Sequence, residues 1–219
     1  MGQGQVPGLA EFLLEYPLMA VRPVNDYWLT LTGEFDLAAT YDSYTVRDSF
    51  ELTIFVPFGF PQVVPMVLEL GGCIPKGGGY HVNPDGTLCL GSPLRLLLKI
   101  HKTGDLTGFA KECLIPYLFA ISKKLKEGGN LVFSELGHGD EGILSDYQDI
   151  FGLKAPLQVV TVLKALTLKK RRANKRPCPC GCGRRLGRCP FNKKVKIFRA
   201  LASRSWYTSQ HQTILNMLP

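Results

Sequence analysis

A cysteine at position 89 stands in a segment whose composition suits nucleophilic chemistry. His81 and Asn83 are two residues apart, and a Pro-Asp-Gly turn signal at 84–86 leads to Cys89, which has a leucine on either side. A glycine run at 77–79 precedes them and leaves room for a bulky group. A cysteine attacks efficiently when nearby groups lower its pKa or stabilise its thiolate. His81 and Asn83 supply polar groups of that kind, so the segment predicts covalent catalysis by Cys89.

Four further cysteines gather within twelve residues near the end of the chain. Thiolates at such close spacing are typical of metal sites in proteins whose cysteines stay reduced. No acidic residue lies near them, so a structural metal is favoured over a catalytic one. The predicted metal ligands are Cys178, Cys180, Cys182 and Cys189.

The other candidate residues receive simpler interpretations. Cys113 lies among apolar residues of a predicted helix and is expected to be a small buried hydrophobe. Cys73 follows a predicted strand and is expected to be structural. His101 follows Cys89 and could deprotonate an incoming amine, with a surface histidine as the alternative. Asp85 is interpreted as a turn residue.

The composition indicates a globular protein. Of the 219 residues 45% are hydrophobic and 20% are charged, which excludes the disordered and fibrous classes. No apolar run reaches the roughly 18 residues that span a bilayer, and the first ten residues lack the basic region of a signal peptide. We therefore expect a cytoplasmic protein with reduced cysteines and no membrane partner.

The net charge of +8 is concentrated in the C-terminal part of the chain. Residues 1–163 contain 18 acidic residues against 11 basic ones, whereas no Asp or Glu occurs from 164 to 204. Such a segment favours an acidic partner, either a protein surface or a nucleic acid. Nucleic acid is the less favoured of the two, because few aromatic residues interleave with the basic residues. The bases are Lys164, Lys169, Lys170, Arg171, Arg172, Lys175, Arg176, Arg184, Arg185, Arg188, Lys193, Lys194, Lys196, Arg199 and Arg204.

Hydrophobic patterns predict the elements that position the first cysteine segment. Residues 8–20 have apolar side chains at helical spacing. Residues 26–35 and 48–57 alternate as strands do, with a turn at 42–43 between them, and a further strand is predicted at 65–70. A helix followed by antiparallel strands indicates the α+β class.

Helices are predicted after Cys89. A short apolar piece at 93–100 precedes a long helical pattern at 105–126, which Pro116 should kink. Further helices are predicted at 143–151 and 157–172. Phe191, Phe198, Trp206 and Tyr207 are interpreted as one face of a single terminal helix.

The order of these elements, with His81-x-Asn83 and Cys89-Leu90 after a proline-rich turn, resembles the ubiquitin-conjugating (E2) enzymes. The resemblance implies a UBC-fold domain over 1–153, an antiparallel meander with flanking helices, and a helical, zinc-knuckle-like tail over 154–219. It also implies that Cys89 forms a thioester, that Asn83 holds the loop and stabilises the oxyanion, and that His81 fixes the loop by hydrogen bonds.

Two differences mark a subgroup. Val82 replaces the proline of the family's His-Pro-Asn signature, and the spacing from Asn83 to Cys89 is shorter than in eukaryotic E2 enzymes. The short form is similar to the E2-like proteins of bacteria.

The second cysteine group resembles the SEC-C zinc motif, Cys-x-Cys-Gly-Ser-Gly followed by a basic turn and two further ligands. Cys182 stands where that motif has serine, and Pro190 where its fourth ligand belongs. The resemblance implies structural zinc held by Cys178, Cys180 and Cys189, with either Cys182 or the distant His211 as the fourth ligand. A knuckle without metal is the alternative.

An E2-like domain joined to such a tail resembles the E2 proteins of CBASS anti-phage defence. The resemblance implies that Cys89 captures the C-terminus of a cGAS-like nucleotidyltransferase as a thioester and passes it to an amine. Alternatives from other classes are a non-catalytic E2-variant binding module and a nucleic-acid-binding protein that acts through its basic tail. The simplest alternative for Cys89 itself is a buried cysteine at a strand end.

Overall fold

A long antiparallel hairpin forms the centre of the N-terminal part of the protein. In the computed structural model, which describes residues 6–23, 27–131 and 139–218, β2 (Trp28–Tyr41) pairs with β3 (Tyr44–Pro57) along its whole length. Every second side chain on each strand faces the core, as the pleat of a strand requires. The buried residues are Leu29, Leu31, Phe35 and Leu37 from β2, and Val46, Phe50, Leu52, Ile54 and Val56 from β3.

The hairpin is closed by the two residues Asp42 and Ser43, which confirms the predicted turn. Their φ angles are 48° and 67°, and Tyr41 pairs directly with Tyr44. Positive φ at both central residues is the geometry of a type I′ turn, whose twist matches that of the strands. Aspartate tolerates this left-handed conformation better than most residues do.

Two short strands complete a meander. β1 (Met19–Val21) pairs with β2 and β4 (Met66–Glu69) pairs with β3, all antiparallel, in the order β1-β2-β3-β4. The predicted strands at 48–57 and 65–70 are confirmed, as is that at 26–35 apart from residue 26, which lies outside the described residues. The α+β class is confirmed as well.

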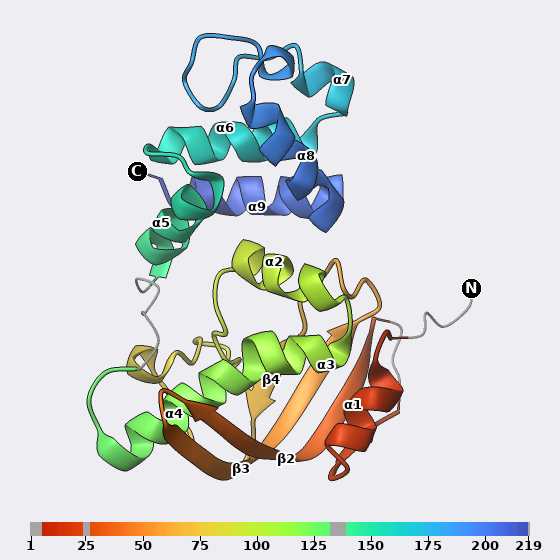
Figure 1. The fold of residues 1–219 in the computed structure, drawn as a ribbon, viewed down its shortest axis with the longest axis vertical. Coiled ribbons are helices and arrows are strands. Elements are labelled where there is room, and N and C mark those ends of the chain that lie inside the picture. The colour runs from red at the N-terminus through yellow and green to blue at the C-terminus, as the bar shows by residue number, and fades with distance from the viewer. Residues whose placement is uncertain (1–5, 24–26, 132–138, 219) are drawn as a thin grey trace. The chain divides into compact units, whose positions relative to one another are not determined.

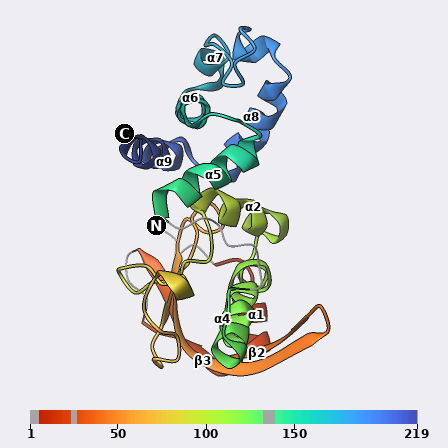
Figure 2. The same cartoon turned by 90° about the vertical axis from the view of Figure 1, so that its left-hand side faces the viewer.

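The first helix is shorter than the pattern predicts. α1 spans Leu9–Glu15, and Pro17 separates it from β1, which occupies part of the predicted helix 8–20. Pro17 has no backbone N–H to donate within a helix. Tyr16, directly after α1, stacks on Phe35 of β2 with 4.2 Å between ring centroids. Figures 1 and 2 show that α1 and α4 (Ile115–Glu127) lie on the same face of the curved sheet.

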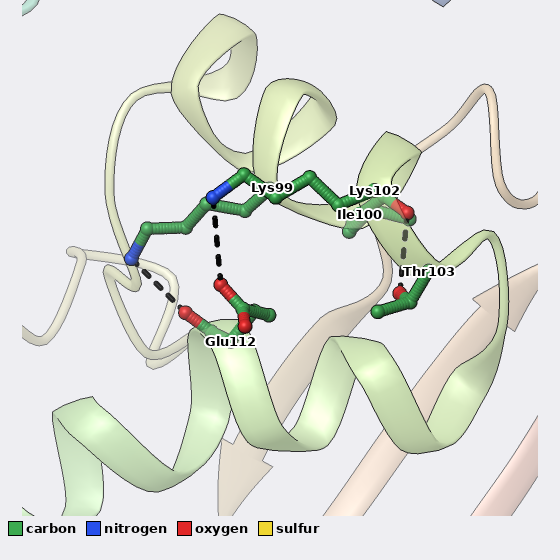
Figure 3. A network of polar contacts seen from close by, with 5 residues as sticks. All are labelled: Lys99, Ile100, Lys102, Thr103 and Glu112. Atoms are coloured by element: carbon green, nitrogen blue, oxygen red, sulfur yellow. Dashed lines mark hydrogen bonds and ion pairs between the residues drawn. The ribbon is translucent and has the colours of Figure 1, made fainter.

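The helical run predicted at 105–126 is irregular just before Pro116. The helical run consists of α3 (Leu106–Phe109), a π-helical segment (Ala110–Leu114) and α4, with Pro116 in the first turn of α4. Because Pro116 has no N–H, the carbonyl oxygen of Glu112, four residues earlier, lacks its usual α-helical donor. Lys99 Nζ donates to that oxygen at 3.0 Å, as Figure 3 shows.

Lys99 belongs to α2 (Pro93–Thr103), which follows the Cys89 segment directly. Lys102 of the same helix lies 4.0 Å from the Glu112 carboxylate, and Thr103 Oγ1 donates to the carbonyl of Ile100 at 3.3 Å (Figure 3). Two lysines of α2 thus contact this helical run, and the Lys99 hydrogen bond is the closer of the two contacts. This contact fixes the element that leads away from Cys89.

The C-terminal part forms its own compact unit. The two units are Met1–Glu135 and Leu136–Pro219, whereas the sequence prediction places the boundary between 153 and 154. The second unit contains α5 (Gly139–Phe151), α6 (Pro156–Thr167), α7 (Lys170–Ala173), α8 (Phe191–Leu201) and α9 (Arg204–Asn216). Its buried side chains include Tyr147, Phe151, Val159, Leu163, Phe198, Tyr207 and Ile214.

The second unit has an apolar core of its own. Phe151 meets Phe198 edge to face at 4.7 Å, and the hydroxyl of Tyr147 donates to Gln210 at 2.6 Å. The prediction of a single terminal helix that carries Phe191, Phe198, Trp206 and Tyr207 is wrong, because α8 and α9 are separate helices. The side chain of Ser203 accepts from the N–H of Trp206 and begins α9 as an N-cap.

Within the described residues, no single helix has the length and apolar character needed to cross a membrane. The consecutive helices α5 and α6 meet that requirement only when taken together, and they are bent by 68° relative to each other.

Replacing Gly108 tests the close approach of α3 to the end of α2. A Cβ at this position would lie 2.3 Å from Cβ of Thr103, so backbone as well as side chains must move. We expect Gly108→Ala to lower the free energy of unfolding by about 1–3 kcal/mol, as overpacked sites do. Chemical denaturation of the full chain measures it.

Gly79→Ala is the matched control. The nearest atom to its added Cβ is the end of a lysine side chain at 4.0 Å. Its effect should stay within about 0.5 kcal/mol. Equal losses in the two variants would contradict the steric argument.

Candidate active-site hairpin and cysteine cluster

Cys89 lies on one arm of a small hairpin. Val82 pairs with Leu88, the N–H of Asn83 donates to Thr87 O at 2.9 Å, and the N–H of Cys89 donates to His81 O at 2.7 Å. His81 therefore stands directly opposite Cys89 in the pairing register, and Asn83 stands opposite Thr87. The structure brings together three of the predicted site residues, Cys89, His81 and Asn83.

The tip of the hairpin is an Asx turn built on Asp85. Its Oδ1 accepts from the N–H of Thr87 at 3.0 Å and from the Thr87 hydroxyl at 2.6 Å. These two bonds lower the pKa of the Asp85 carboxyl, with the hydroxyl as the larger cause. The interpretation of Asp85 as a turn residue is confirmed.

The hairpin is attached to the edge of the sheet. The N–H of Leu88 donates to Val67 O of β4 at 2.8 Å, and Thr87 forms a bridge with Leu68. The side chain of Leu88 is buried in the core. Cys89 is thus the residue directly after an anchored position, which restricts where its sulfur can lie.

Helix α4 holds the other arm through two side chains that the sequence analysis did not single out. The Tyr117 hydroxyl donates to Tyr80 O at 2.8 Å, and Lys124 Nζ donates to Gly79 O at 2.6 Å. Lys124 also lies 5.0 Å from the centre of the Tyr80 ring. The two residues are seven positions apart, which places them on one face of a helix. The seven-residue spacing is visible in the sequence and indicates a shared helix face. It does not indicate which backbone carbonyls the two side chains contact.

The thiol of Cys89 is half-buried. Burial raises its pKa, and the backbone N–H of Gly91 offsets part of that rise. Burial also raises the pKa of Tyr117, with further contributions from Cys89 and then Glu69, so its hydroxyl stays protonated and can donate. At neutral pH the Cys89 sulfur is therefore mostly a thiol and needs a base or a pre-activated acyl group in order to react.

Asn83 and His81 occupy different environments. Asn83 is exposed, and its Nδ2 donates to the Thr87 hydroxyl at 3.0 Å, which leaves a second amide proton available. His81 is half-buried with φ 51°, a left-handed backbone that few non-glycine residues adopt. Strained backbone of this kind occurs at functional sites when the surrounding structure holds it in place.

His101 lies in the last turn of α2 and is exposed. Eight helical steps from Pro93 carry it about 12 Å along the helix axis. Among the residues that the structure describes, no hydrogen bond joins His101 to Cys89 or Asn83. Cys113 is buried, as expected, and burial raises its pKa to about 12. Cys73 is exposed on the same unit.

In the second unit, the four predicted cysteine ligands converge. The sulfur of Cys180 lies 3.2 Å from that of Cys178 and 3.6 Å from that of Cys189, and Cys182 lies 3.6 Å from Cys189. All four sulfurs are within 4.8 Å of one another. Four thiolates around one Zn²⁺ at about 2.3 Å would be about 3.8 Å apart. The cluster can therefore hold a metal ion.

A short backbone ladder shapes this cluster. The N–H of Cys178 donates to Arg184 O at 2.8 Å, and Pro177 bridges to Arg185. The backbone N–H of Arg184, and then its side chain, lower the pKa of Cys182 to about 6, whereas burial raises that of Cys178. Cys182 thus supplies a thiolate at neutral pH. His211, the alternative ligand, lies on α9, where burial and then Lys164 lower its pKa.

Comparison with protein-family models, with curated proteins and with solved structures finds no match for this chain. The hairpin and the cysteine cluster are therefore interpreted through their own geometry. One geometry offers a positioned thiol beside an amide donor. The other offers four soft ligands around one point.

The pH dependence of alkylation tests the environment of Cys89. Because burial raises its pKa, the rate with iodoacetamide should increase about tenfold per pH unit from neutral pH to about pH 9. Mass spectrometry of the native chain resolves the rate at each cysteine. The exposed Cys73 reports solvent access, and the buried Cys113 should react only after unfolding. A plateau in the Cys89 rate below about pH 8 would contradict the predicted direction.

Proposed function

We propose that the first unit is an E2-like acyl carrier in which Cys89 holds the C-terminus of a partner protein as a thioester. One observation carries this proposal: the hairpin places Cys89 opposite His81 and on the same arm as the Asn83 partner Thr87, between the sheet edge and α4. A helix, an antiparallel meander, the cysteine hairpin and further helices also follow one another in the E2 order. The finer assignment, a UBC fold, is part of the proposal.

The chemistry consists of two acyl transfers. The Cys89 thiolate attacks the carbonyl carbon of an activated acyl group and forms a C–S bond, and the carrier group of the donor leaves. An amine then attacks the thioester, an amide bond forms, the amine loses a proton, and the Cys89 thiolate leaves. The chain lacks a glycine-rich nucleotide-binding motif, so the acyl group must arrive already activated.

The surrounding residues have distinct roles in this proposal. The free proton of Asn83 Nδ2 stabilises the oxyanion while its other proton stays on Thr87. His81 shapes the loop through its backbone, which accepts from Cys89. His101 deprotonates the attacking amine only if the acceptor protein bridges the distance to the end of α2. The partner proposed by resemblance is a cGAS-like nucleotidyltransferase in cytoplasmic anti-phage defence.

A trapping experiment tests the thioester. Cys89→Ser should convert a labile thioester into a more stable oxyester when the chain is expressed with the products of neighbouring genes. We expect a covalent adduct of higher mass, identified by mass spectrometry, whose attachment maps to residue 89. In the wild-type chain the adduct should be released by hydroxylamine, and Cys89→Ala should abolish it.

Cys73→Ser is the matched control, because Cys73 is an exposed cysteine of the same unit. It should leave the adduct at residue 89 unchanged. An adduct that survives Cys89→Ala, or that maps to position 73, would sink the assignment of the nucleophile.

A second candidate is a non-catalytic module that binds a ubiquitin-like tail. The half-burial of Cys89 and its raised pKa favour this candidate, since neither is required for a thiol that never reacts. The trapping experiment separates the two. A module of this kind binds its partner equally well with Cys89→Ala and forms no adduct.

For the second unit, we propose a structural zinc held by Cys178, Cys180, Cys182 and Cys189. The donor set supports this, because four thiolates form a closed tetrahedral site that leaves no position for a substrate. When bound, zinc neutralises thiolates that lie close together. The site lies between α7 and α8 in the sequence, and one residue, Pro190, separates Cys189 from the start of α8.

Metal removal should destabilise the second unit without unfolding it. The full chain should contain one zinc per molecule, and a chelator should lower the thermal midpoint while most of the far-UV helical signal remains, because α5, α6, α8 and α9 bury a core of their own. Cys178→Ser should reduce the zinc content, and Cys73→Ser should not. Full zinc content in Cys178→Ser would contradict the ligand set, and a chain purified without zinc would support the metal-free alternative.

A further inference from the structure

Most of the basic residues between 164 and 204 are exposed, and no acidic residue occurs in that stretch of the sequence. Thirteen of the fifteen are exposed. The four acidic residues of the second unit all belong to α5. A high density of like charge opposes compact packing. Its presence on this unit therefore suggests a purpose other than stability. The exposed bases are Lys164, Lys169, Lys170, Arg171, Arg172, Lys175, Arg176, Arg184, Arg185, Arg188, Lys193, Lys196 and Arg204.

The two remaining bases have structural roles. Arg199 donates to the carbonyls of Ala165 at 2.6 Å and Leu168 at 2.9 Å, at the C-terminal end of α6. Lys194 donates to Phe151 O at 2.9 Å, at the end of α5. Cations at these positions satisfy carbonyls that a helix end leaves without partners. Their charge is therefore already used inside the unit.

Several of the exposed basic residues lie beside the cysteine cluster in the sequence. Arg184 is set aside, because it acts on Cys182. Six others lie on α7, on residues 174–177 that follow it and on residues 185–188 within the cluster, and backbone hydrogen bonds join the last two segments. We call these six residues the knuckle surface. They are Arg171, Arg172, Lys175, Arg176, Arg185 and Arg188.

Backbone hydrogen bonds fix the two segments of the knuckle surface against each other. The N–H of Leu186 donates to Arg176 O at 2.9 Å, and the N–H of Gly187 donates to Asn174 O at 3.0 Å. Pro177 and Arg185 form a bridge next to the first of these bonds. A Cβ on Gly187 would lie 3.1 Å from Asn174 O, so the segments are in close contact. Basic side chains from two segments of the sequence are thereby held close to each other.

We propose that the knuckle surface binds the phosphate backbone of double-stranded nucleic acid without reading its sequence. Five of its six residues are arginines, whose planar guanidinium groups pair with phosphate oxygens by two parallel hydrogen bonds. Contacts of this kind position a protein on a duplex and carry no base information.

The composition of the surface selects the duplex over single strands. No Phe, Trp or Tyr occurs from 169 to 190. Single-strand binding relies on aromatic side chains on which bases stack, and the surface has none. The sequence expectation weighed against nucleic acid because aromatic residues are scarce, but contact with a duplex backbone does not need them.

An acidic protein surface is the competing partner. Protein interfaces have an apolar centre with a polar rim, whereas the segment 169–188 contains no acidic residue and only one leucine, the buried Leu186. The uniform charge fits a uniform polyanion better. The inference is independent of the thioester chemistry, because it uses no residue of the first unit.

Salt-dependent binding of the full chain tests the proposal. Fluorescence anisotropy is measured with a short random-sequence DNA duplex, an RNA duplex of the same sequence, the single strands and polyglutamate. We expect both duplexes to bind more tightly than the single strands and polyglutamate, with an affinity that falls steeply as salt increases. Arg172→Gln/Arg176→Gln/Arg185→Gln should weaken duplex binding about tenfold or more and reduce the salt slope by about 3.

Three controls give each outcome a meaning. Arg22→Gln/Arg47→Gln/Lys76→Gln removes the same charge from exposed positions of the first unit and should bind as the wild type does. Arg172→Lys/Arg176→Lys/Arg185→Lys keeps the charge and should retain the salt slope, which also shows that the surface is folded. Cys89→Ala should bind the duplex unchanged, whatever the trapping experiment gives.

The proposal is overturned by any of three results. These are no duplex binding at low salt, equal losses in the two glutamine triple variants, and tighter binding of polyglutamate than of duplex. The last result would assign the surface to an acidic protein instead.

Discussion

The candidate active site depends on how the open edge of β4 is satisfied. A strand at the edge of a sheet presents unpaired N–H and C=O groups. Here the Val67 carbonyl accepts from Leu88, and the chain then turns back on itself through the hairpin that contains Cys89. The same hydrogen bond completes the sheet and places the nucleophile candidate. The burial of Leu88 beside it gives that bond an apolar support.

A second constraint acts from the helical side. Pro116 interrupts the helix between the π-helical segment and α4, and the Glu112 carbonyl left without its helical donor accepts from Lys99. Lys99 belongs to α2, so the helix that follows the cysteine hairpin is attached at this interruption. Tyr117, which directly follows Pro116, and Lys124, about two turns further along α4, donate to the loop that precedes the hairpin. The site is thus held in place by hydrogen bonds to backbone carbonyls rather than by ion pairs.

The sequence predicted the parts of this arrangement that are local. Alternation identified β2 and β3, and the turn signal at 84–86 predicted a turn between His81 and Cys89, whereas the pairing of the two arms into a hairpin was not predicted. β1 was missed because three residues are too short to show alternation. The contacts of Lys99 with Glu112 and of Tyr117 with Tyr80 could not be predicted, since they depend on packing between separate segments. The core of the second unit was missed because each of its helices shows only half of a contact.

The type I′ turn at Asp42 and Ser43 has a consequence for tolerance to insertion and deletion. It is an exposed loop at the tip of the longest hairpin, where changes of length are commonly harmless. Yet its two residues set the register of strands that are each fourteen residues long. Gaining or losing one residue there, and shifting the pairing with it, would turn either Phe35 or Phe50 outward, together with the buried neighbours on the same strand. The length of the loop is therefore constrained although the loop is exposed.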